Sequence, residues 1–386
     1  MINEKSNKKV LIFSAYYYPA HKAGGTVRSV FNLTRLLSKH YNCYVVTSDR
    51  DYQDTSCYPG IVPCKWGKLG NENVFYAPWK WYSIVKLMKL IKQVDPDILY
   101  LNSLYCYRFS ILPLFVIMLM SKLDKVVLAP RGEFSSGALK ISAKKKALYL
   151  FYLRALRLYK KIKWHATSED EFKNIQKKFA GVHITLKNDL VDFSEKINPD
   201  NWTDKENGVV KIAFIARITK MKNMLYCFDV FKMIPGTITV TFDIYGAIDD
   251  QIYYERVVNA IKELPANIKV EYKGAIKHSS VVETFQKYDL FFLPTLGENF
   301  CHSIIESLYS GTPVLISDQT PWRNLQEKNV GYDLPLACKE NYVNAIKFVA
   351  QKKEPEYRLW RQAIHDYAIE WIEKNNNVDE YLKIFE

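Results

Sequence analysis

Short apolar runs alternate with stretches of helical periodicity along most of the chain, and this alternation limits the possible folds more than any other feature. The first strand is expected at 9–13, and the helix after it carries these residues at helical spacing: Val27, Val30, Phe31, Thr34 and Leu37. Further strands are expected at 44–47, 98–101, 126–129 and 164–167, with helices near 84–94, 109–121 and 143–161. This pattern predicts an α/β, doubly wound parallel sheet whose ligands bind outside the carboxyl ends of its strands.

The alternation starts again in the second half of the chain. Strands are expected there at 209–215, 240–244, 268–272, 290–293 and 314–317. With 386 residues the chain is long enough for two domains, each with its own core. We therefore expect a first domain at 1–195, a linker rich in Asp, Asn and Pro at 196–208, and a second domain at 209–360. A terminal helix at 361–386 is expected to cross back onto the first domain.

Charge and cysteine content narrow the chemistry. The 54 Lys and Arg residues against 41 Asp and Glu give a net charge of +13, which predicts an acidic partner such as nucleotide phosphates, anionic lipid or nucleic acid. The seven cysteines are scattered without a C-x-x-C pair, which excludes a disulfide framework or zinc cluster and suits a reducing cytosol. The longest apolar run, 111–120, is too short to span a bilayer, and 10–15 is too short for a secretory signal.

The stretch 290–316 combines a buried strand, a loop and a helix with two glutamates eight residues apart. The helix is expected at about 300–310, with Asn299 as its N-cap and Gly311 ending it. Glu306 lies off the apolar face, and the free N–H groups at the helix start suit a phosphate. Eight residues of helix span about 12 Å, more than the 5–9.5 Å of a glycosidase carboxylate pair. Glu298 and Glu306 are therefore expected to bind separate hydroxyl groups of one elongated ligand.

Two other strand-to-helix turns carry groups that suit a phosphate. Gly24 and Gly25 follow the first strand of the chain, where backbone N–H groups can approach a ligand closely. Arg217 and Lys222 flank the turn after strand 209–215, so that both can reach one diphosphate. Neither a G-x-G-x-x-G motif nor a Walker lysine follows these strands, so no dinucleotide or P-loop site is indicated.

Between Phe134 and Ser168 the sequence contains no acidic residue. Basic residues alternate there with leucines and aromatic residues, and the basic ones expected to face a membrane are Lys140, Lys144, Lys145, Lys146, Arg154 and Arg157. A basic helix with apolar residues between its charges suits an anionic membrane surface, at about 1 kcal/mol per basic residue. A domain helix with a solvated basic face explains the pattern equally well. Nucleic acid is not expected as a partner, because no recognised reader motif accompanies the charge.

Taken together, these motifs resemble the retaining nucleotide-sugar glycosyltransferases of family 4. The shared features, in the same order, are Gly24-Gly25, then Arg217 with Lys222, then the E-x7-E pair of Glu298 and Glu306. The segments 130–135, 165–168, 294–300 and 313–325 look like those of the bacterial members that build surface polysaccharides. The resemblance covers essentially the whole chain and implies the GT-B fold, in which two Rossmann-like domains face each other across a cleft.

The resemblance also implies roles for individual residues. Arg217 and Lys222 bind the donor diphosphate, Glu306 holds the ribose hydroxyls, and Glu298 holds the transferred sugar. The remaining donor contacts are implied for Gly24, Gly25, Ala275, Ile276, Asn299, Phe300, Cys301 and His302. Arg131 and Glu133 are implied to line the acceptor side.

The sequence departs from this family at two positions. Cys301 stands where the family usually has glycine, which narrows the space beside the donor sugar. Asn102 stands where many members have an acceptor-side histidine, so we assign no general base there. We expect no metal site, although Asp49 and Asp51 form a D-x-D pattern, and no cofactor beyond a nucleotide-sugar substrate, with a UDP-sugar favoured.

The expected function is transfer of a sugar to a lipid-linked saccharide during surface polysaccharide synthesis, on the inner face of the cytoplasmic membrane. Three alternatives stay open: transfer to a soluble acceptor, a nucleotide-sugar 2-epimerase or hydrolase, and a membrane-docked scaffold that binds nucleotides without turnover.

Overall fold

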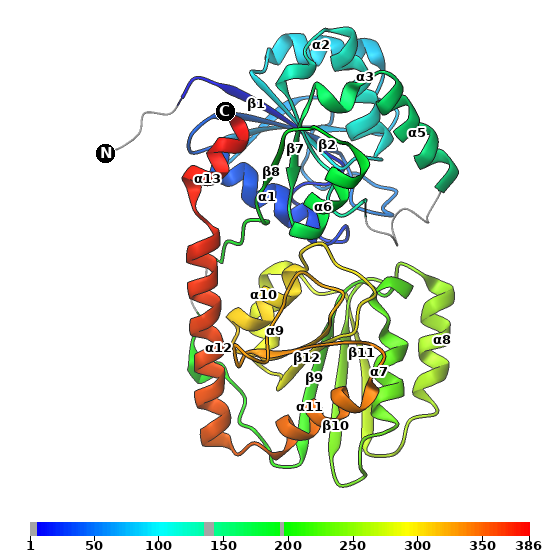
Figure 1. Cartoon of the computed structure of the whole chain (residues 1–386), viewed down its shortest axis with the longest axis vertical. Helices are drawn as coiled ribbons and strands as arrows, with labels where there is room; N and C mark the ends of the chain where they lie inside the picture. Colours follow the sequence, from blue (N-terminus) through cyan, green and yellow to red (C-terminus); the bar gives the residue numbers. More distant parts are fainter. Residues whose placement is uncertain (1–5, 135–142, 194–196) are drawn as a thin grey trace. The chain divides into compact units, whose positions relative to one another are not determined.

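The computed structural model describes residues 6–134, 143–193 and 197–386. These residues form two compact units, one that ends at Asp192 and is completed by Asn376–Glu386, and one made of Phe193–Asn375. Each unit contains one sheet with helices packed on it, and Figure 1 labels the elements of both.

The first unit is built on an eight-stranded sheet in the order β3-β4-β2-β1-β5-β6-β7-β8. Its strands are β1 (Lys9–Ser14), β2 (Asn42–Ser48), β3 (Trp66–Leu69), β4 (Glu72–Ala77), β5 (Ile98–Asn102), β6 (Val126–Ala129), β7 (Lys163–Ala166) and β8 (Ile184–Leu186). All neighbouring pairs are parallel except β3 with β4. Because β1 pairs with β2 on one side and β5 on the other, the strand order reverses beside β1.

Side chains of β1 show that both faces of this sheet are covered. Val10 and Ile12 belong to one apolar cluster, whereas Leu11 and Phe13 belong to another. The helices of this unit are α1 (Gly25–Leu37), α2 (Ile84–Val94), α3 (Leu112–Leu119), α5 (Ala143–Ala155), α6 (Glu169–Lys178) and α13 (Val378–Leu382). A sheet buried on both faces explains why its strands read as continuous apolar runs.

Two helices end earlier than the sequence pattern indicates. The helix expected to reach residue 161 stops at Ala155, because Arg157 adopts a left-handed conformation (φ 51°). The terminal segment is not one helix but two, α12 (Glu354–Asn375) and α13. Asn376 separates them: its side chain exchanges hydrogen bonds with the backbone of Val191, and the Asn377 side chain then caps α13.

The second unit contains a six-stranded sheet in the order β11-β10-β9-β12-β13-β14, with every pair parallel. Its strands are β9 (Val209–Ile215), β10 (Thr239–Tyr245), β11 (Ile268–Gly274), β12 (Leu290–Leu293), β13 (Val314–Ser317) and β14 (Gly331–Leu334). Its helices are α7 (Met224–Phe231), α8 (Gln251–Ile261), α9 (Val281–Phe285), α10 (His302–Tyr309), α11 (Lys339–Gln351) and α12. The strand order reverses between β9 and β12, and ligands of doubly wound sheets bind beside such a reversal.

Helix α10 is fixed at its carboxyl end by a close-packed glycine. Gly311 has φ 77°, and a Cβ on it would lie 2.7 Å from the Trp202 ring and 2.9 Å from the Arg361 carbonyl. Glycine is the residue that adopts this conformation without steric cost, and here it also leaves room for α12 to pack against α10. The sequence-based prediction that Gly311 ends this helix is therefore confirmed.

Candidate functional site

The loops that follow β9 and β12 are tied together at the point where the strand order reverses. The amide of Asn223 donates to the Pro294 carbonyl at 3.0 Å, and Leu296 N–H donates to the Met221 carbonyl at 2.8 Å. Asn223 has φ 56°, a left-handed conformation that asparagine tolerates better than most residues. Residues 217–223 and 294–298 therefore form one structure at the carboxyl edge of the sheet.

Lys222 and Glu298 form a largely buried ion pair in these loops. The Lys222 ammonium contacts Glu298 Oε1, and only 17% and 11% of the two side chains are exposed. The Thr295 hydroxyl lies 3.0 Å from the same carboxylate oxygen. Burial alone would lower the pKa of Lys222, but the attraction of Glu298 outweighs burial and raises it. Lys222 is thus held as a fixed positive charge at this edge.

Arg217 lies in the loop after β9, and its side chain is paired with a residue of the loop after the neighbouring strand β10. Its guanidinium donates to Asp249 at 2.9 Å, and its side chain is 40% exposed. The loops after β9 and β10 approach each other closely, as shown by Gly246: a Cβ on this residue would overlap the backbone of Ala216. Arg217 therefore presents a partly exposed cation, and the backbone next to it is packed tightly against the loop after β10.

Glu306 points from α10 toward a different strand end. Its side chain is only 5% exposed, and Oε1 lies 2.9 Å from Nε2 of His278, which follows β11. Ala275 and Ile276 lie in the same loop between β11 and the 3₁₀ turn at His278, and Ala275 is exposed. Glu306 therefore contacts, through His278, the same loop that contains the residues expected to meet a nucleobase.

Helix α10 begins later than the sequence pattern indicates. Its N-cap is Cys301, not Asn299, and Cys301 adopts a left-handed conformation (φ 67°). Phe300 is buried before it, and the Phe300 carbonyl accepts a hydrogen bond from the Trp322 indole at 2.7 Å. The Trp322 contact fixes the chain direction at Phe300, two residues before the helix, so the turn occurs at Cys301 and His302 starts the helix.

The thiol of Cys301 is not available as a nucleophile. Burial strongly raises the pKa of Cys301, and the Glu298 carboxylate raises it further. The thiol therefore stays protonated beside Lys222 and Glu298. A left-handed backbone here also gives a physical reason for the glycine that the family resemblance implies at this position.

In the first unit the glycine pair starts α1, as the sequence predicts. Gly24 has φ 81°, and Gly25 is the exposed first residue of the helix. The buried Asp51 carboxylate accepts the backbone N–H groups of His21 at 2.7 Å and Lys22 at 3.1 Å. This aspartate of the D-x-D pattern therefore fixes the loop that leads to the glycines.

Arg131 is buried in a polar network at the carboxyl edge of the first sheet. Its guanidinium donates to Asn102 at 2.6 Å, to the Tyr100 hydroxyl at 3.0 Å and to the Asp189 carboxylate. Burial alone would lower its pKa, but Asp189 outweighs that effect and raises it. These contacts join β5 and the segment after β8 through one cation.

Glu133 is also engaged internally. Its carboxylate accepts the N–H groups of Leu104 at 2.5 Å and Tyr105 at 3.0 Å, as well as the Ser103 hydroxyl at 3.0 Å. Burial raises the pKa of Glu133. The structure thus places Arg131 and Glu133 at the predicted edge with intramolecular partners, and their acceptor role stays a prediction.

His165 extends the Arg131 network and adds a group whose protonation at low pH would disturb its hydrogen bonds. The Tyr100 hydroxyl lies 2.8 Å from its Nδ1, while Nε2–H can donate to the Lys187 carbonyl at 3.0 Å. Burial, helped by the Arg131 charge, lowers the pKa of His165 to about 4. The imidazole is therefore neutral in the folded protein at neutral pH.

We expect the free energy of unfolding to fall as pH decreases from about 6.5 to about 4. In this range His165 binds a proton in the unfolded state but stays neutral in the folded state. The contribution of this residue is on the order of 3 kcal/mol. Urea titrations across this window should show a flatter pH dependence for His165→Gln. The exposed His183→Gln serves as the control and should keep the full slope. An unchanged slope in His165→Gln would contradict this assignment.

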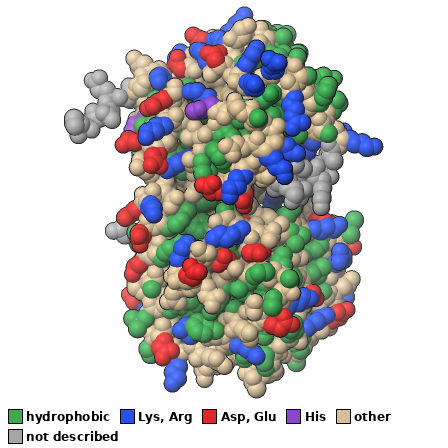
Figure 2. Space-filling model, viewed as in Figure 1, with side chains coloured by type: hydrophobic (Ala, Val, Ile, Leu, Met, Phe, Trp, Pro, Cys, Tyr) green, Lys and Arg blue, Asp and Glu red, His purple; other side chains and the backbone are tan. Residues whose placement is uncertain are grey.

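The basic residues expected to face a membrane lie mainly on α5. Lys144, Lys145, Arg154 and Arg157 are exposed, whereas Lys146 lies over the Tyr105 ring at 4.7 Å. Lys140 lies outside the described residues. Among the apolar side chains of this segment, Leu150 and Leu153 on α5 are buried, and four are more than half exposed, namely Leu148, Phe151 and Tyr152 on α5 and Leu156 just after its end. Figure 2 shows basic and apolar side chains side by side where Figure 1 labels α3 and α5.

A family model matches the unit that carries Arg217, Lys222, Glu298 and Glu306. Residues 196–366 match the glycosyl transferases of group 1. A comparison with curated protein sequences finds no match. The group 1 match spans the loops after β9 and β12 and helix α10, so the geometry described above lies inside it.

Several solved structures are similar to the whole chain. Sucrose-phosphate synthase from Thermosynechococcus elongatus is 15% identical, with a TM-score of 0.69 and coverage of 98% of this chain and 97% of that one. HepE of Anabaena, solved with UDP and glucose, is 12% identical, with a TM-score of 0.68 over 98% and 100%. WaaG, a glycosyltransferase of lipopolysaccharide biosynthesis, is 13% identical, with a TM-score of 0.64 over 97% of each chain. These similarities confirm the predicted GT-B fold class of two parallel-sheet α/β domains.

Sequence reasoning missed several residues of these sites. Asp249 and His278 follow β10 and β11, and the rule that functional groups follow parallel strands could have found both. The residues of the Arg131 network gave no such signal, because Tyr100, its own partner His165, and Asp189 lie in three separate segments. Within the part of the chain that the structure describes, no helix has the length and apolarity to cross a membrane.

Proposed function

We propose that this chain is a retaining glycosyltransferase that moves a sugar from a nucleotide-sugar donor, with a UDP-sugar favoured, to an acceptor hydroxyl. The observation that carries the proposal is the set of groups beside the β9–β12 reversal: a buried lysine held positive, a braced arginine, and a buried glutamate on α10. Two cations and a carboxylate suit the two halves of such a donor, its diphosphate and its ribose hydroxyls.

In the proposed reaction the bond between the sugar C1 and the β-phosphate oxygen breaks while C1 bonds to the acceptor oxygen. Negative charge develops on the leaving phosphate, and Arg217 and Lys222 stabilise it. The leaving phosphate takes the acceptor proton on the same face, so the anomeric configuration is retained. Lys222 has three N–H donors and can keep Glu298 while it binds phosphate. Glu298 is then placed to accept a hydroxyl of the transferred sugar, and no further cofactor enters the step.

Glu306 is proposed to bind the ribose hydroxyls through the carboxylate oxygens. His278 orients that carboxylate, because the imidazole lies 2.9 Å from Oε1. Ala275 and Ile276 precede this histidine and are proposed to meet the nucleobase with their backbone. Gly24 and Gly25 are proposed to approach the phosphates from the first unit, through the free N–H groups that start α1.

The donor can be identified by its effect on stability. A ligand that binds only the folded state raises the melting temperature, so we expect a UDP-sugar to raise it more than GDP- or ADP-sugars do. Glu306→Gln should abolish most of that rise, while Glu283→Gln, an exposed change on α9, should preserve it. A rise that is equal for all three nucleotides would contradict recognition of the base.

The acceptor is proposed to be a saccharide linked to lipid in a membrane, as part of surface polysaccharide synthesis on the cytoplasmic face. Support comes from α5 and the residues just after it, where exposed lysines and arginines lie beside four exposed apolar side chains. Such a surface gains both from anionic headgroups and from burial of apolar area. The enzyme should therefore sediment with liposomes of anionic lipid, and Lys144→Glu/Lys145→Glu should release it. Lys262→Glu/Lys269→Glu, two exposed changes in the second unit, should not.

A soluble acceptor is the second candidate, because sucrose-phosphate synthase and trehalose-6-phosphate synthase are among the similar structures. Failure to bind any liposome, with turnover on a free sugar or sugar phosphate, would favour it. Incubation with donor alone separates the remaining alternatives: an epimerase or hydrolase consumes donor without acceptor, and a scaffold binds it without turnover. Proton NMR of the product tests retention directly.

Replacement of Cys301 by glycine is expected to widen the choice of donor sugar. The thiol lies beside Lys222 and Glu298, and glycine adopts the same left-handed backbone without its side chain. We expect kcat/KM for a donor with a bulkier sugar to rise about 10-fold relative to the preferred donor, the scale of one small steric group. Competition assays with two donors measure this ratio, and a ratio that does not change would remove Cys301 from sugar selection.

A further inference from the structure

The first unit contains a pocket far from the edge where α1 starts. It lies between the second half of α1 and the turn that joins β3 to β4, and its volume is about 380 Å³. Helix α1 begins at the carboxyl edge of the sheet and runs back for 13 residues, so the pocket lies about 20 Å from Gly24. Its size is in the range of small-molecule sites.

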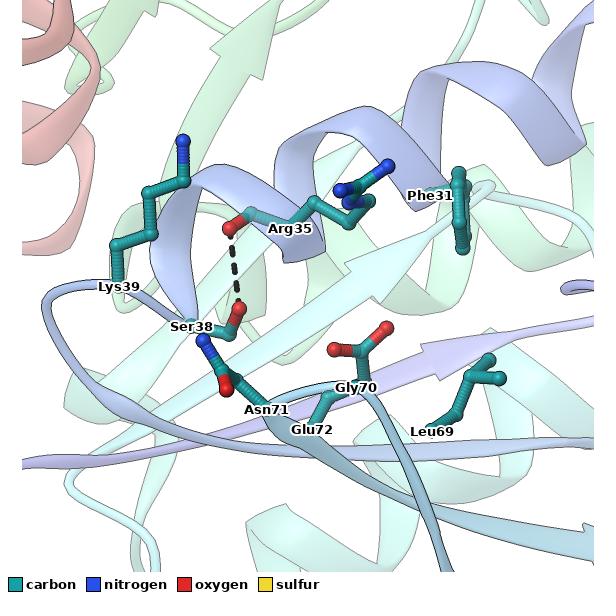
Figure 3. Close-up of a pocket in the computed structure, with 8 residues that line it drawn as sticks. All are labelled: Phe31, Arg35, Ser38, Lys39, Leu69, Gly70, Asn71 and Glu72. Atoms are coloured by element: carbon teal, nitrogen blue, oxygen red, sulfur yellow. Dashed lines mark hydrogen bonds between the residues drawn. The ribbon is translucent and has the colours of Figure 1, made fainter. Parts of the chain in front are cut away.

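A buried carboxylate forms one wall of this pocket. Glu72 is 2% exposed, and its Oε1 accepts a hydrogen bond from the buried Tyr17 hydroxyl at 2.9 Å. No Lys, Arg or His among the described residues forms an ion pair with it. Figure 3 shows the Glu72 carboxylate directed into the space below Arg35 and Phe31. A carboxylate in this position still has lone pairs for the hydroxyl groups of a ligand.

Two cations stand on the opposite side without a carboxylate partner. Arg35 on α1 and Lys39 just after its end are exposed, and neither forms an ion pair within the described residues. The pocket therefore holds one acidic and two basic side chains that do not pair with each other. A bound molecule that meets all three needs hydroxyl groups at one end and a negative charge at the other.

The remaining walls suit the ring of a sugar. Phe31 is half-buried, stacks on Tyr18 with 5.5 Å between ring centroids, and has the Arg35 guanidinium 5.7 Å from its own centroid. Leu69 adds a second apolar surface, and Asn71 offers an amide. At Gly70, which has φ 59°, a Cβ would lie 3.4 Å from Glu72 Oε2, so the turn passes close to that carboxylate oxygen.

From these contacts we infer that this pocket binds a sugar carrying an acidic group, with its hydroxyls on Glu72 and Asn71 and its negative charge on Arg35 and Lys39. A uronate residue and a sugar phosphate share this chemistry. Such a site holds an acidic saccharide on the first unit at a distance from Gly24 and Gly25. The inference does not rest on sugar transfer, because it uses no residue of the second unit.

Binding to the full-length protein should be measured by titration calorimetry with three probes: glucuronate, glucose 6-phosphate and glucose. We expect at least one charged probe to bind at millimolar concentration or tighter and at least 10-fold more tightly than glucose. Arg35→Ala/Lys39→Ala should weaken that binding at least 10-fold, whereas Lys89→Ala/Lys92→Ala, two exposed changes on α2, should not. Tighter binding of glucuronate identifies an acidic polysaccharide as the source, and tighter binding of glucose 6-phosphate identifies a phosphorylated sugar.

UDP titrations on the same samples separate this site from the donor site. UDP affinity should be the same in Arg35→Ala/Lys39→Ala as in the wild type. Glu72→Gln keeps the acceptor for Tyr17 and should weaken probe binding while the melting temperature stays close to that of the wild type. Equal affinity for glucose and the charged probes, or unchanged affinity in Arg35→Ala/Lys39→Ala, would overturn the inference whatever the UDP result.

Discussion

Lys222→Ala is expected to lower kcat by about 10²–10³, the effect of removing one preorganised donor that meets charge as it develops in a transition state. The structure supports a loss of this size, because the Lys222 ammonium is largely buried and its pKa is raised by Glu298, so its charge is present throughout catalysis. The effect is measured by initial-rate kinetics. The donor is the nucleotide-sugar that raises the melting temperature most, and the acceptor is a lipid-linked saccharide. The KM for donor should change much less than kcat, since the proposed interaction is strongest with the leaving phosphate.

A matched control for Lys222 lies two residues away. Lys220 belongs to the same 3₁₀ turn but is exposed and has no role in the proposed step, so Lys220→Ala should leave kcat within about twofold of wild type. Because Lys222→Ala leaves Glu298 buried without its cation, the double variant Lys222→Ala/Glu298→Gln tests whether the loss is only structural. Recovery of most of the turnover in that double variant, or more than half of wild-type turnover in the single one, would remove Lys222 from the reaction.

Arg131→Met is expected to destabilise the first unit by about 3–5 kcal/mol, since it removes the buried guanidinium that pairs with the Asp189 carboxylate. The same change removes donors from Asn102 and from the Tyr100 hydroxyl. Urea unfolding followed by tryptophan fluorescence measures the loss, because Trp164 lies in the core of this unit. Arg35→Met, an exposed change on α1, should shift the unfolding free energy by less than about 0.5 kcal/mol.

The Arg131 prediction separates two roles for the residue. Arg131→Met/Asp189→Asn removes both charges, so we expect it to recover part of the stability lost in the single variant. A single variant as stable as the wild type, with acceptor affinity lost, would show instead that Arg131 acts mainly on the acceptor.

The fold could be predicted because its signals are local. Each apolar run between two helical stretches became a strand, and the glycines at 24, 25 and 311 fall at helix ends as expected. Strands β3, β4, β8 and β14 were missed, because they lie at or beside sheet edges or carry short, mixed sequences. Edge strands are buried less and therefore show a weaker apolar pattern.

The candidate site could be predicted only in part, for a related reason. Strand-end rules placed Arg217, Lys222 and Glu298 in the loops of one sheet edge and Glu306 in the helix that follows one of these loops. The rules could not show that Lys222 pairs with Glu298, which lies 76 positions later, or that His278 meets Glu306. Nor could they show that the guanidinium of Arg131 donates its hydrogen bonds to residues of the same unit, since that depends on how β5 and the segment after β8 pack. Pairings between distant segments are set by the folded sheet and not by spacing along the chain.

The return of the last residues to the first unit affects how the protein folds during synthesis. Tyr381, Ile384 and Phe385 are buried in the apolar cluster that contains Val10 and Ile12 of β1. These residues of the first core therefore leave the ribosome only after the entire second unit has emerged. The second unit can fold while synthesis continues, but the first must wait with apolar surface uncovered. Deleting Asn376–Glu386 should therefore yield a chain that aggregates, and supplying that segment as a separate peptide should restore solubility.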